Sequence, residues 1–377
     1  MTTQSDSSEH AQIQVMVVDD SAVVRGLLTR TLESDPLIRV VASVGNGSMA
    51  LAALGRAAAI EVVVLDIEMP VMDGLTALPK LIAARPGLQV IMASALTRQN
   101  AHITLQALAA GAAECIAKPS SNRDVGSADD FKRDLIAKVK ALAIAARESS
   151  GLPMPRPRDP AAGPPVRPHA NAGRPVRLRT IPIAAPAVLA IGSSTGGPQA
   201  LFTVLSSIAG AVSLPIFVTQ HMPATFTTIL AEHIAQASRT PAAEARDGEP
   251  VTGGRIYIAP GDFHMTVIPE RDRKVVRLSK EPPENYCRPS VDPMLRSLAR
   301  AYGSGVFALI LTGMGHDGLR GAEAVIAAGG AVVAQDEATS VVWGMPGAVA
   351  TAGLCSAVLP LPDIAPYLRK LILRSAA

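Results

Sequence analysis

The chain has 377 residues, a formal net charge of +3 and 48% hydrophobic residues, enough for two ordinary domains, which excludes disorder throughout. Three widely scattered cysteines, Cys115, Cys287 and Cys355, argue against a disulfide framework and a cysteine-based metal site, and they favour a reducing compartment. The first ten residues do not resemble a signal peptide and no apolar run approaches the ~20 residues of a membrane span, so we expect a cytoplasmic protein without membrane insertion.

The first part of the chain alternates short apolar runs with helical patterns, which is typical of a parallel α/β sheet. The apolar runs are 13–18, 40–44, 62–65, 89–93 and 113–117, and the helical patterns cover 23–33, 48–58 and 131–146. Polar side chains follow four of the runs, namely Asp19 with Asp20, Asp66, Ser94 and Lys118. Because the carboxyl ends of parallel strands meet at the ligand crevice, we expect these side chains to lie together. There the carboxylates can hold a hard cation, while the lysine and the hydroxyl can bind an anion.

Residues 13–146 resemble a response-regulator receiver domain, through those five positions and through the run LD-x-EMP-x-MDG that starts at Leu65. The resemblance implies a flavodoxin-like fold with Mg²⁺ as cofactor for phosphorylation. The implied roles are phosphoryl acceptor for Asp66, Mg²⁺ ligands for Asp19, Asp20 and Asp66, switch hydroxyl for Ser94 and phosphoryl contact for Lys118. One position departs from the family: Cys115 stands where most members have Phe or Tyr, which leaves the aromatic rotamer switch without its usual residue.

Residues 147–186 have the composition of an extended, semi-rigid linker. They are rich in proline, and seven arginines against two acids give them a net charge of +5, which leaves −2 for the rest of the chain. The folded parts are therefore not basic, and we expect no nucleic-acid partner. A contact of this basic stretch with nucleic acid or an acidic partner is the alternative to a solvated spacer.

The segment 187–200, AVLAIGSSTGGPQA, is an apolar run that stops at a glycine-rich turn before a helical pattern. Gly192, Ser194 and Gly196 fit the G-x-S-x-G nucleophile elbow, in which glycines permit a sharp turn that presents the serine hydroxyl above the sheet. Ser194 is therefore the candidate nucleophile. So short a pattern also arises by chance, so the rest of the chain has to supply a base.

A histidine follows the next apolar run, 215–219, where Gln220 and then His221 come at the expected strand end. Among the other six histidines, only His316 also stands at a strand end. Since His221 emerges one βα unit after Ser194, neighbouring parallel strands bring the two within reach, and we favour His221 as the base.

The apolar run 306–312 enters residues 313–318, GMGHDG, and two interpretations compete there. The glycines satisfy G-x-G-x-x-G between a strand and a helix, with Asp336 near the expected ribose-binding distance, which favours a dinucleotide site. Against it, Asp317 puts a carboxylate where the pyrophosphate belongs. A helix-terminus dipole would instead keep Asp317 ionised, as suits a group that orients a histidine.

The chain order Ser, His, Asp differs from the Ser, Asp, His of α/β-hydrolases. Residues 187–377 resemble the catalytic domain of chemotaxis protein-glutamate methylesterases, through GSSTGG, TQHMP, YIAPGD-x-HM, RPSVD, LTGMG-x-DG and V-x-GMP. The resemblance implies a cofactor-free esterase with Ser194 as nucleophile, His221 as base, Asp317 as its orienter, and Thr195 and Met314 lining the site. The segment PPENYC before Arg288 departs from the basic stretch that the family usually has there.

We therefore expect two doubly wound parallel-sheet α/β domains: a flavodoxin-like receiver, 13–146, and a Rossmann-like esterase, 187–377, joined by the Pro/Arg-rich linker 147–186. The expected function is a phosphorylation-activated serine esterase that hydrolyses glutamate methyl esters on methyl-accepting chemotaxis receptors, with release of methanol, and deamidates their glutamines. A chemotaxis histidine kinase is the expected phosphodonor. A non-catalytic binding module and a dinucleotide-dependent oxidoreductase are the competing classes.

Overall fold

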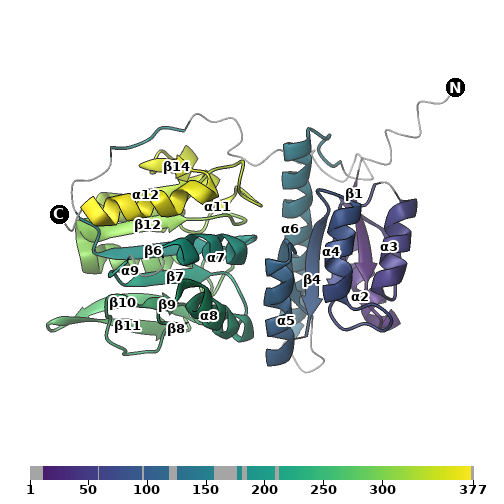
Figure 1. The fold of residues 1–377 in the computed structure, drawn as a ribbon, viewed down its shortest axis with the longest axis horizontal. Coiled ribbons are helices and arrows are strands. Elements are labelled where there is room, and N and C mark those ends of the chain that lie inside the picture. Colours follow the sequence, from purple (N-terminus) through teal and green to yellow (C-terminus); the bar gives the residue numbers. More distant parts are fainter. Residues whose placement is uncertain are drawn as a thin grey trace. The chain divides into compact units, whose positions relative to one another are not determined.

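The chain forms two compact units, which divide between residues 170 and 171 (Figure 1). The computed structural model describes residues 12–57, 59–95, 97–118, 125–156, 176–180, 185–208 and 212–374. Most of the predicted linker therefore lies outside the described residues. Within the described ranges, no helix has both the length and the apolar character needed to cross a bilayer.

The first unit is a five-stranded sheet with strand order β2-β1-β3-β4-β5, in which all neighbouring strands are parallel. This is the flavodoxin-like order that the sequence predicts. Its strands are β1 Ile13–Val18, β2 Ile38–Val44, β3 Val62–Asp66, β4 Gln89–Ser94 and β5 Glu114–Ala117, and its helices are α2 Ala22–Glu33, α3 Gly47–Arg56, α4 Gly74–Ala84, α5 Arg98–Ala109 and α6 Val125–Ser150.

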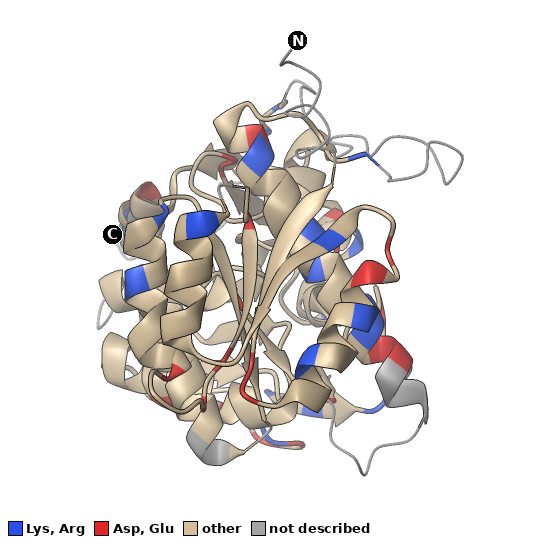
Figure 2. Ribbon diagram, turned by 90° about the vertical axis from the view of Figure 1, so that its right-hand side faces the viewer, with Lys and Arg blue, Asp and Glu red and all other residues tan. Residues whose placement is uncertain are grey.

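Polar caps set where these helices begin. The side chains of Ser21, Asn46 and Asp73 accept hydrogen bonds from the first turns of α2, α3 and α4, which satisfies backbone N–H groups that have no partner within the helix. Helix α2 packs on α6, while α3, α4 and α5 pack in a row, and Figure 2 shows helices on both sides of this sheet. Strands covered on both faces read as continuous apolar runs, which is why they were recognisable in the sequence.

Helix α6 extends beyond its predicted end at Ala146, because Arg147 is anchored in the first unit. Its side chain is 2% exposed, and it donates to both carboxylate oxygens of Glu61, at 2.5 and 2.6 Å, and to the carbonyl of Gln12 at 2.8 Å. A guanidinium is retained in such a place when its hydrogen bonds are satisfied. The assignment of Arg147 to a solvated basic linker is therefore corrected.

The second unit has a seven-stranded sheet with strand order β14-β13-β12-β6-β7-β9-β8, parallel throughout, and a separate antiparallel pair β10-β11. Its strands are β6 Val188–Ser193, β7 Ile216–Gln220, β8 Ala242–Glu244, β9 Ile256–Ile258, β10 His264–Glu270, β11 Arg273–Ser279, β12 Val306–Ile310, β13 Ala331–Gln335 and β14 Ala357–Leu359. Its helices are α7 Gly197–Ser207, α8 Ala224–Ser238, α9 Val291–Tyr302, α10 Leu319–Ala327, α11 Met345–Thr351 and α12 Leu361–Arg374, with the 3-10 turn η2 Gly303–Gly305.

Helices cover both faces of this sheet, as the predicted doubly wound architecture requires. A Cβ on Gly192 would lie 2.6 Å from Val291 of α9, and a Cβ on Gly197 at the start of α7 would lie 2.9 Å from Cβ of Ser193. Successive residues of a strand face opposite sides, so α9 and α7 cover opposite faces. The chain leaves β6 toward β7 on one side and reaches β12 on the other, which places the topological switch point, where such folds bind ligands, between β6 and β12.

Candidate active site and acidic site

Ser194 is the first residue after β6, in a turn held by three hydrogen bonds. Its N–H donates to the carbonyl of Thr312 at 3.0 Å, and its carbonyl accepts from Gly197 N–H at 2.7 Å and from Nε2 of Gln220 at 2.9 Å. Gly196 has φ 74° and ψ −2°, the values of the third residue in a type II turn, which glycine adopts without steric cost. Ser194 is not among the described residues with positive φ. The turn therefore differs from a nucleophile elbow, in which the serine itself is strained.

The two neighbouring serines have different environments. Ser193 is fully buried and its hydroxyl donates to Oε1 of Gln220 at 2.7 Å, whereas Ser194 is 8% exposed. Ser194 also lies directly against Gly313, because a Cβ on that glycine would be 2.8 Å from Cβ of Ser194. The absence of a side chain at residue 313 thus lets the ends of β6 and β12 approach closely.

His221 and Asp317 are in direct contact. Nε2 of His221 lies 2.7 Å from Oδ2 of Asp317. Residues Ser193 and Gln220 are register partners on the parallel strands β6 and β7, which lie about 4.8 Å apart, so Ser194 and His221 leave adjacent strands at the same level. Among the described residues, however, no hydrogen bond joins the Ser194 hydroxyl to the imidazole. The structure thus pairs the predicted base and its orienter and places the predicted nucleophile at the next strand end.

The buried carboxylate of Asp317 accepts an unusually complete set of hydrogen bonds. The donors are Nε2 of His221 at 2.7 Å, Nδ2 of Asn285 at 2.9 Å, Oγ of Ser290 at 2.8 Å, and the backbone N–H groups of Val291 at 2.6 Å, Asp292 at 3.1 Å and Gly318 at 2.9 Å. Burial by itself raises the pKa of Asp317, but the hydrogen bond and charge of His221, with the donors Val291 and Ser290, hold the pKa far below its ordinary value. The group therefore stays a carboxylate at the C-terminal end of the sheet.

Three residues around this pair, Asn285, Cys287 and Ser290, were not predicted from the sequence as site residues. Asn285 and Tyr286 have φ 54° and 62°, and Glu284 and Cys287 exchange backbone hydrogen bonds of 3.1 and 3.0 Å across them, which describes a tight turn of the primed type. The turn brings Sγ of Cys287 to 3.4 Å from Nδ1 of His221. Only Ser290 had a recognisable signal, since a serine immediately before an apolar helical pattern is a common helix cap.

The environment of His221 favours its charged form. Burial lowers the pKa of His221, but the sulfur of Cys287 and the carboxylate of Asp317 outweigh burial and raise the pKa well above its ordinary value. Because Nε2 faces a carboxylate, Nε2 carries the hydrogen, and the lone pair of the neutral ring is on Nδ1. The nitrogen that can accept a proton is therefore the one beside Cys287.

The geometry contradicts the dinucleotide interpretation of residues 313–318. The N–H of Gly318 donates to Asp317, and the N–H of Gly321 donates to Oδ1 of Asp292 at 2.6 Å. Carboxylates of the protein thus accept the hydrogen bonds of N–H groups at the start of α10 that a pyrophosphate would need. His316 is exposed and Met314 half-buried, while Thr195 is fully buried with a hydroxyl oxygen that has no partner among the described residues.

In the first unit, the predicted acidic residues and lysine meet at the C-terminal edge of the sheet. Nζ of Lys118 lies 2.6 Å from Oδ2 of Asp19 and 2.6 Å from Oδ1 of Asp66. Burial raises the pKa of Asp66, and the Lys118 hydrogen bond and charge only partly oppose this. The hydroxyl of Ser94, at the end of the neighbouring strand β4, donates to the carbonyl of Ala95 at 3.1 Å.

The carboxylates of this cluster fit a hard divalent cation. One oxygen each of Asp19, Asp20 and Asp66 lie within 4.8 Å of one another. Oδ2 of Asp19 is buried and, although close to Lys118, has no partner with hydrogen-bond geometry. An oxygen in that state could serve as a Mg²⁺ ligand.

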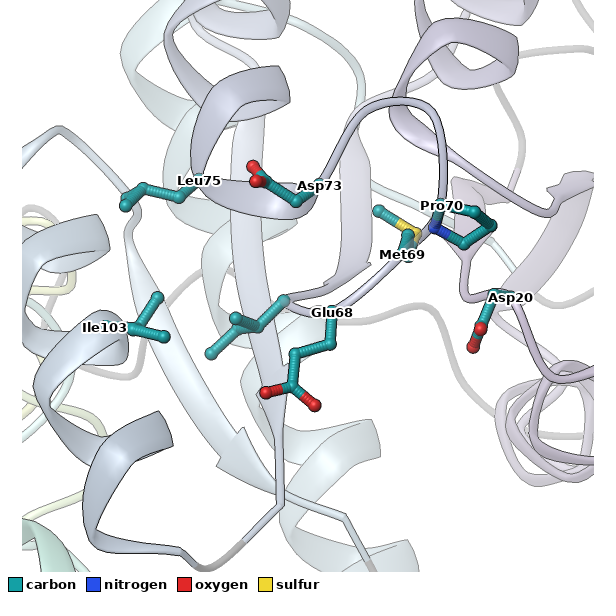
Figure 3. A pocket seen from close by; sticks show the side chains of 8 residues that line it. Asp20, Glu68, Met69, Pro70, Asp73, Leu75 and Ile103 are labelled. Atoms are coloured by element: carbon teal, nitrogen blue, oxygen red, sulfur yellow. The ribbon is translucent and has the colours of Figure 1, made fainter.

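A pocket of about 440 Å³ adjoins the cluster at Asp20 (Figure 3). It is lined by Asp20, Ile67, Glu68, Met69, Pro70, Asp73, Leu75 and Ile103. Three of these side chains are acidic and the others are apolar or proline, so the pocket shares one carboxylate with the candidate cation site.

Two family models match the chain. Residues 15–128 match the response regulator receiver domain, and residues 189–368 match the CheB methylesterase. The chain is 58% identical to protein-glutamate methylesterase/protein-glutamine glutaminase 1 of Paramagnetospirillum magneticum, over 99% of this chain and 100% of that protein, and 58% identical to the enzyme of the same kind from Azospirillum brasilense, over 97% and 94%. The CheB methylesterase catalytic domain of Thermotoga maritima, a solved structure, is 41% identical and covers 50% of this chain and 100% of its own, with a TM-score of 0.48. The chain therefore belongs to the CheB family of protein-glutamate methylesterases that carry a response-regulator receiver domain.

Proposed function

We propose that this chain is a serine esterase that hydrolyses glutamate methyl esters on chemotaxis receptors, releases methanol and deamidates receptor glutamines, under the control of its receiver unit. The observation that carries the proposal is the His221–Asp317 pair, at 2.7 Å and with a buried carboxylate, beside Ser194 at the switch point of the sheet. It is supported by full-length identity to enzymes named for both activities. Release of methanol from methylated receptors by the purified chain tests it.

In the proposed mechanism, Oγ of Ser194 attacks the ester carbonyl and His221 takes the hydroxyl proton on Nδ1. Asp317 fixes the ring through Nε2 and stabilises the imidazolium that forms. The proton then passes to the leaving methanol, or to ammonia when the substrate is a carboxamide. Water hydrolyses the glutamyl ester on Ser194 by the same route in reverse.

The oxyanion is assigned to backbone amides of the Ser194 turn. Within the described residues, the N–H of Thr195 donates to no protein group, and the residue after the nucleophile supplies such a donor in other serine esterases. Each oxyanion donor is typically worth about 2.7–4 kcal/mol of transition-state stabilisation. Half-buried Met314 lines the same end of the sheet.

In the receiver unit, Asp66 accepts the phosphoryl group from a chemotaxis histidine kinase. Asp19, Asp20 and Asp66 would hold Mg²⁺, which supplies charge neutralisation of the phosphoryl oxygens. Lys118, already paired with Asp66 at 2.6 Å, would follow the phosphoryl group, and Ser94 would turn from Ala95 toward it. Three free cysteines and a cytoplasmic kinase as phosphodonor support a cytoplasmic location for the enzyme.

The receiver unit is expected to restrain the esterase until Asp66 is phosphorylated. Residues 187–377 alone should hydrolyse receptor methyl esters faster than the unphosphorylated full chain, and a phosphodonor should raise the full-chain rate. Because such coupling usually amounts to about 1–3 kcal/mol, the activation should be about 5–150-fold. Methanol release measures it, and Asp66→Asn should stay at the low rate. If the isolated unit is no faster, restraint is wrong, and activation has to come from recruitment to the receptor complex.

Phosphorylation of Asp66 is expected to require a divalent cation. The cluster offers a few carboxylates and open positions for water, so Mg²⁺ should bind weakly without a phosphoryl group. Labelling by a small phosphodonor should stop in EDTA and return with Mg²⁺. Asp20→Asn should lower the affinity for Mg²⁺ and so raise the Mg²⁺ concentration needed for labelling. Glu68→Gln, at a residue that lines the pocket outside the cluster, should leave that concentration unchanged. Labelling that continues undiminished in EDTA would contradict the assignment of these ligands.

The esterase is expected to work better at alkaline pH. Because His221 must be neutral to accept a proton and folding raises its pKa, kcat/KM should rise through an apparent pKa above the ordinary value of about 6.5. The raised pKa also means that the imidazolium stabilises the fold. That stabilisation is fully present below about pH 6.5 and is lost as the pH rises through the folded pKa. A pH–rate profile with its rise below about pH 6 would show that Asp317 does not hold His221 as described.

A further inference from the structure

Cys287 is a nucleophile that the esterase mechanism does not use, yet it touches the catalytic pair. Its Sγ is 3.4 Å from Nδ1 of His221, whose Nε2 is 2.7 Å from Asp317. Thiol, imidazole and carboxylate thus form a continuous chain. The same arrangement of groups activates thiols elsewhere, because the imidazole takes the thiol proton and the carboxylate stabilises the resulting imidazolium.

Two side chains of the turn that carries Cys287 fix its position. Glu284 makes two hydrogen bonds with Arg296 of α9, at 2.6 and 2.7 Å, and Asn285 donates to Asp317 at 2.9 Å. Cys287 itself is half-buried, whereas the other two cysteines are buried. The residue therefore combines a base beside its thiol with partial exposure.

The other two cysteines lack these features. Cys115 is 4% exposed and Cys355 fully buried. Burial raises the pKa of Cys115 far above its ordinary value and that of Cys355 to about 12. Since the thiolate is the reactive form, both should react slowly in the folded chain. They provide internal references for the reactivity of Cys287.

We propose that Cys287 is a modification site at which peroxides and other small soft electrophiles reversibly switch off the esterase. The proton of Sγ moves to Nδ1 of His221, and the thiolate attacks one oxygen of the peroxide. An S–O bond forms, the O–O bond breaks, and the leaving hydroxide takes the proton and departs as water. Sulfur is oxidised to a sulfenic acid while the peroxide is reduced. An added thiol restores Cys287 through a mixed disulfide.

Modification at this sulfur stops the esterase because of its position on the ring. Nδ1 is the nitrogen that takes the proton of Ser194, and a sulfenic acid or an alkylated sulfur adds atoms directly against it. This step rests on the proposed role of His221. The reactivity of the thiol itself depends only on the Cys287–His221 contact.

Alkylation of the native full-length chain tests the reactivity without reference to activity. With limiting iodoacetamide, peptide mass spectrometry should find Cys287 labelled at least about tenfold faster than Cys115 and Cys355, since only the thiol of Cys287 lies beside an imidazole. His221→Ala should slow labelling of Cys287 but not of the other two. Equal labelling of all three cysteines, or no effect of His221→Ala, would overturn the proposal.

Peroxide treatment of the full chain tests the consequence. Methanol release should fall in step with sulfenic acid at Cys287 and return with dithiothreitol. Each variant is compared with its own untreated rate: Cys287→Ser should resist peroxide, and the matched control Cys355→Ser should be as sensitive as the wild type. If Cys287 is oxidised with full activity retained, the switch is wrong. Activity that survives Ser194→Ala would instead refute the proposed nucleophile, with the labelling result unaffected.

Discussion

Ser194→Ala is expected to reduce methanol release from methylated receptors by about 10⁶-fold, the loss seen when a serine-triad nucleophile is removed. Ser194 lies at the end of β6 against Gly313 and is partly accessible, and its hydroxyl holds no other group in place among the described residues. The substitution should therefore leave the free energy of unfolding nearly unchanged. Circular dichroism and thermal unfolding check the fold alongside the rate.

Ser193→Ala is the matched control, one residue away. The hydroxyl of Ser193 donates to the buried amide oxygen of Gln220 at 2.7 Å, and Gln220 in turn holds the carbonyl of Ser194. Its loss should cost about 1–3 kcal/mol of stability through an unsatisfied buried acceptor, with a far smaller loss of turnover. If Ser193→Ala abolishes hydrolysis in a folded protein while Ser194→Ala does not, the wrong hydroxyl has been assigned.

Asp317→Asn is expected to lower turnover by about 10⁴-fold, by analogy with the serine-protease triad, because the amide no longer holds His221 in its working tautomer. The groups that contact the two carboxylate oxygens of Asp317 are hydrogen-bond donors, such as His221, Ser290 and the N–H of Val291. Either orientation of an asparagine would direct an NH₂ group at some of these donors, so the substitution should also destabilise the fold by about 1–3 kcal/mol.

Asn285→Gly separates these two effects. Glycine keeps the positive φ of 54° at this position but removes the donor to Asp317, which stays charged and keeps its other partners. Turnover should fall far less than in Asp317→Asn, and the alkaline rise of kcat/KM should persist. If Asn285→Gly is as inactive as Asp317→Asn, turnover depends more on the donors around Asp317 than on the effect of its charge on His221.

The five strands of the first unit and the strands β6, β7 and β12 that carry the site could be predicted from the sequence, because most of them alternate with helices along the chain. Such strands appear as short apolar runs, and the residue after each run necessarily lies at the C-terminal edge. That rule placed Asp66 and His221 at a sheet edge, whereas Ser194 and Asp317 were recognised from the glycine-rich turns that follow β6 and β12. Ser193 and Ser194 have different environments because successive residues of an extended segment face opposite sides. Ser193 is the one that points into the packed face.

Only the tertiary structure decided which side chains complete the site. Arg147 reads as part of a basic, proline-rich stretch, yet Glu61, 86 residues away, draws it into the first unit. Asn285 and Cys287 belong to a turn without a recognisable pattern, and their partners are 32 and 66 residues away in the chain. Contacts between residues so far apart in the sequence depend on how the strands are ordered in the sheet and on how the imidazole of His221 is oriented. The sequence by itself therefore determined the chemistry that meets at each sheet edge, and the packing of distant loops onto that edge decided how His221 is held and what else can reach it.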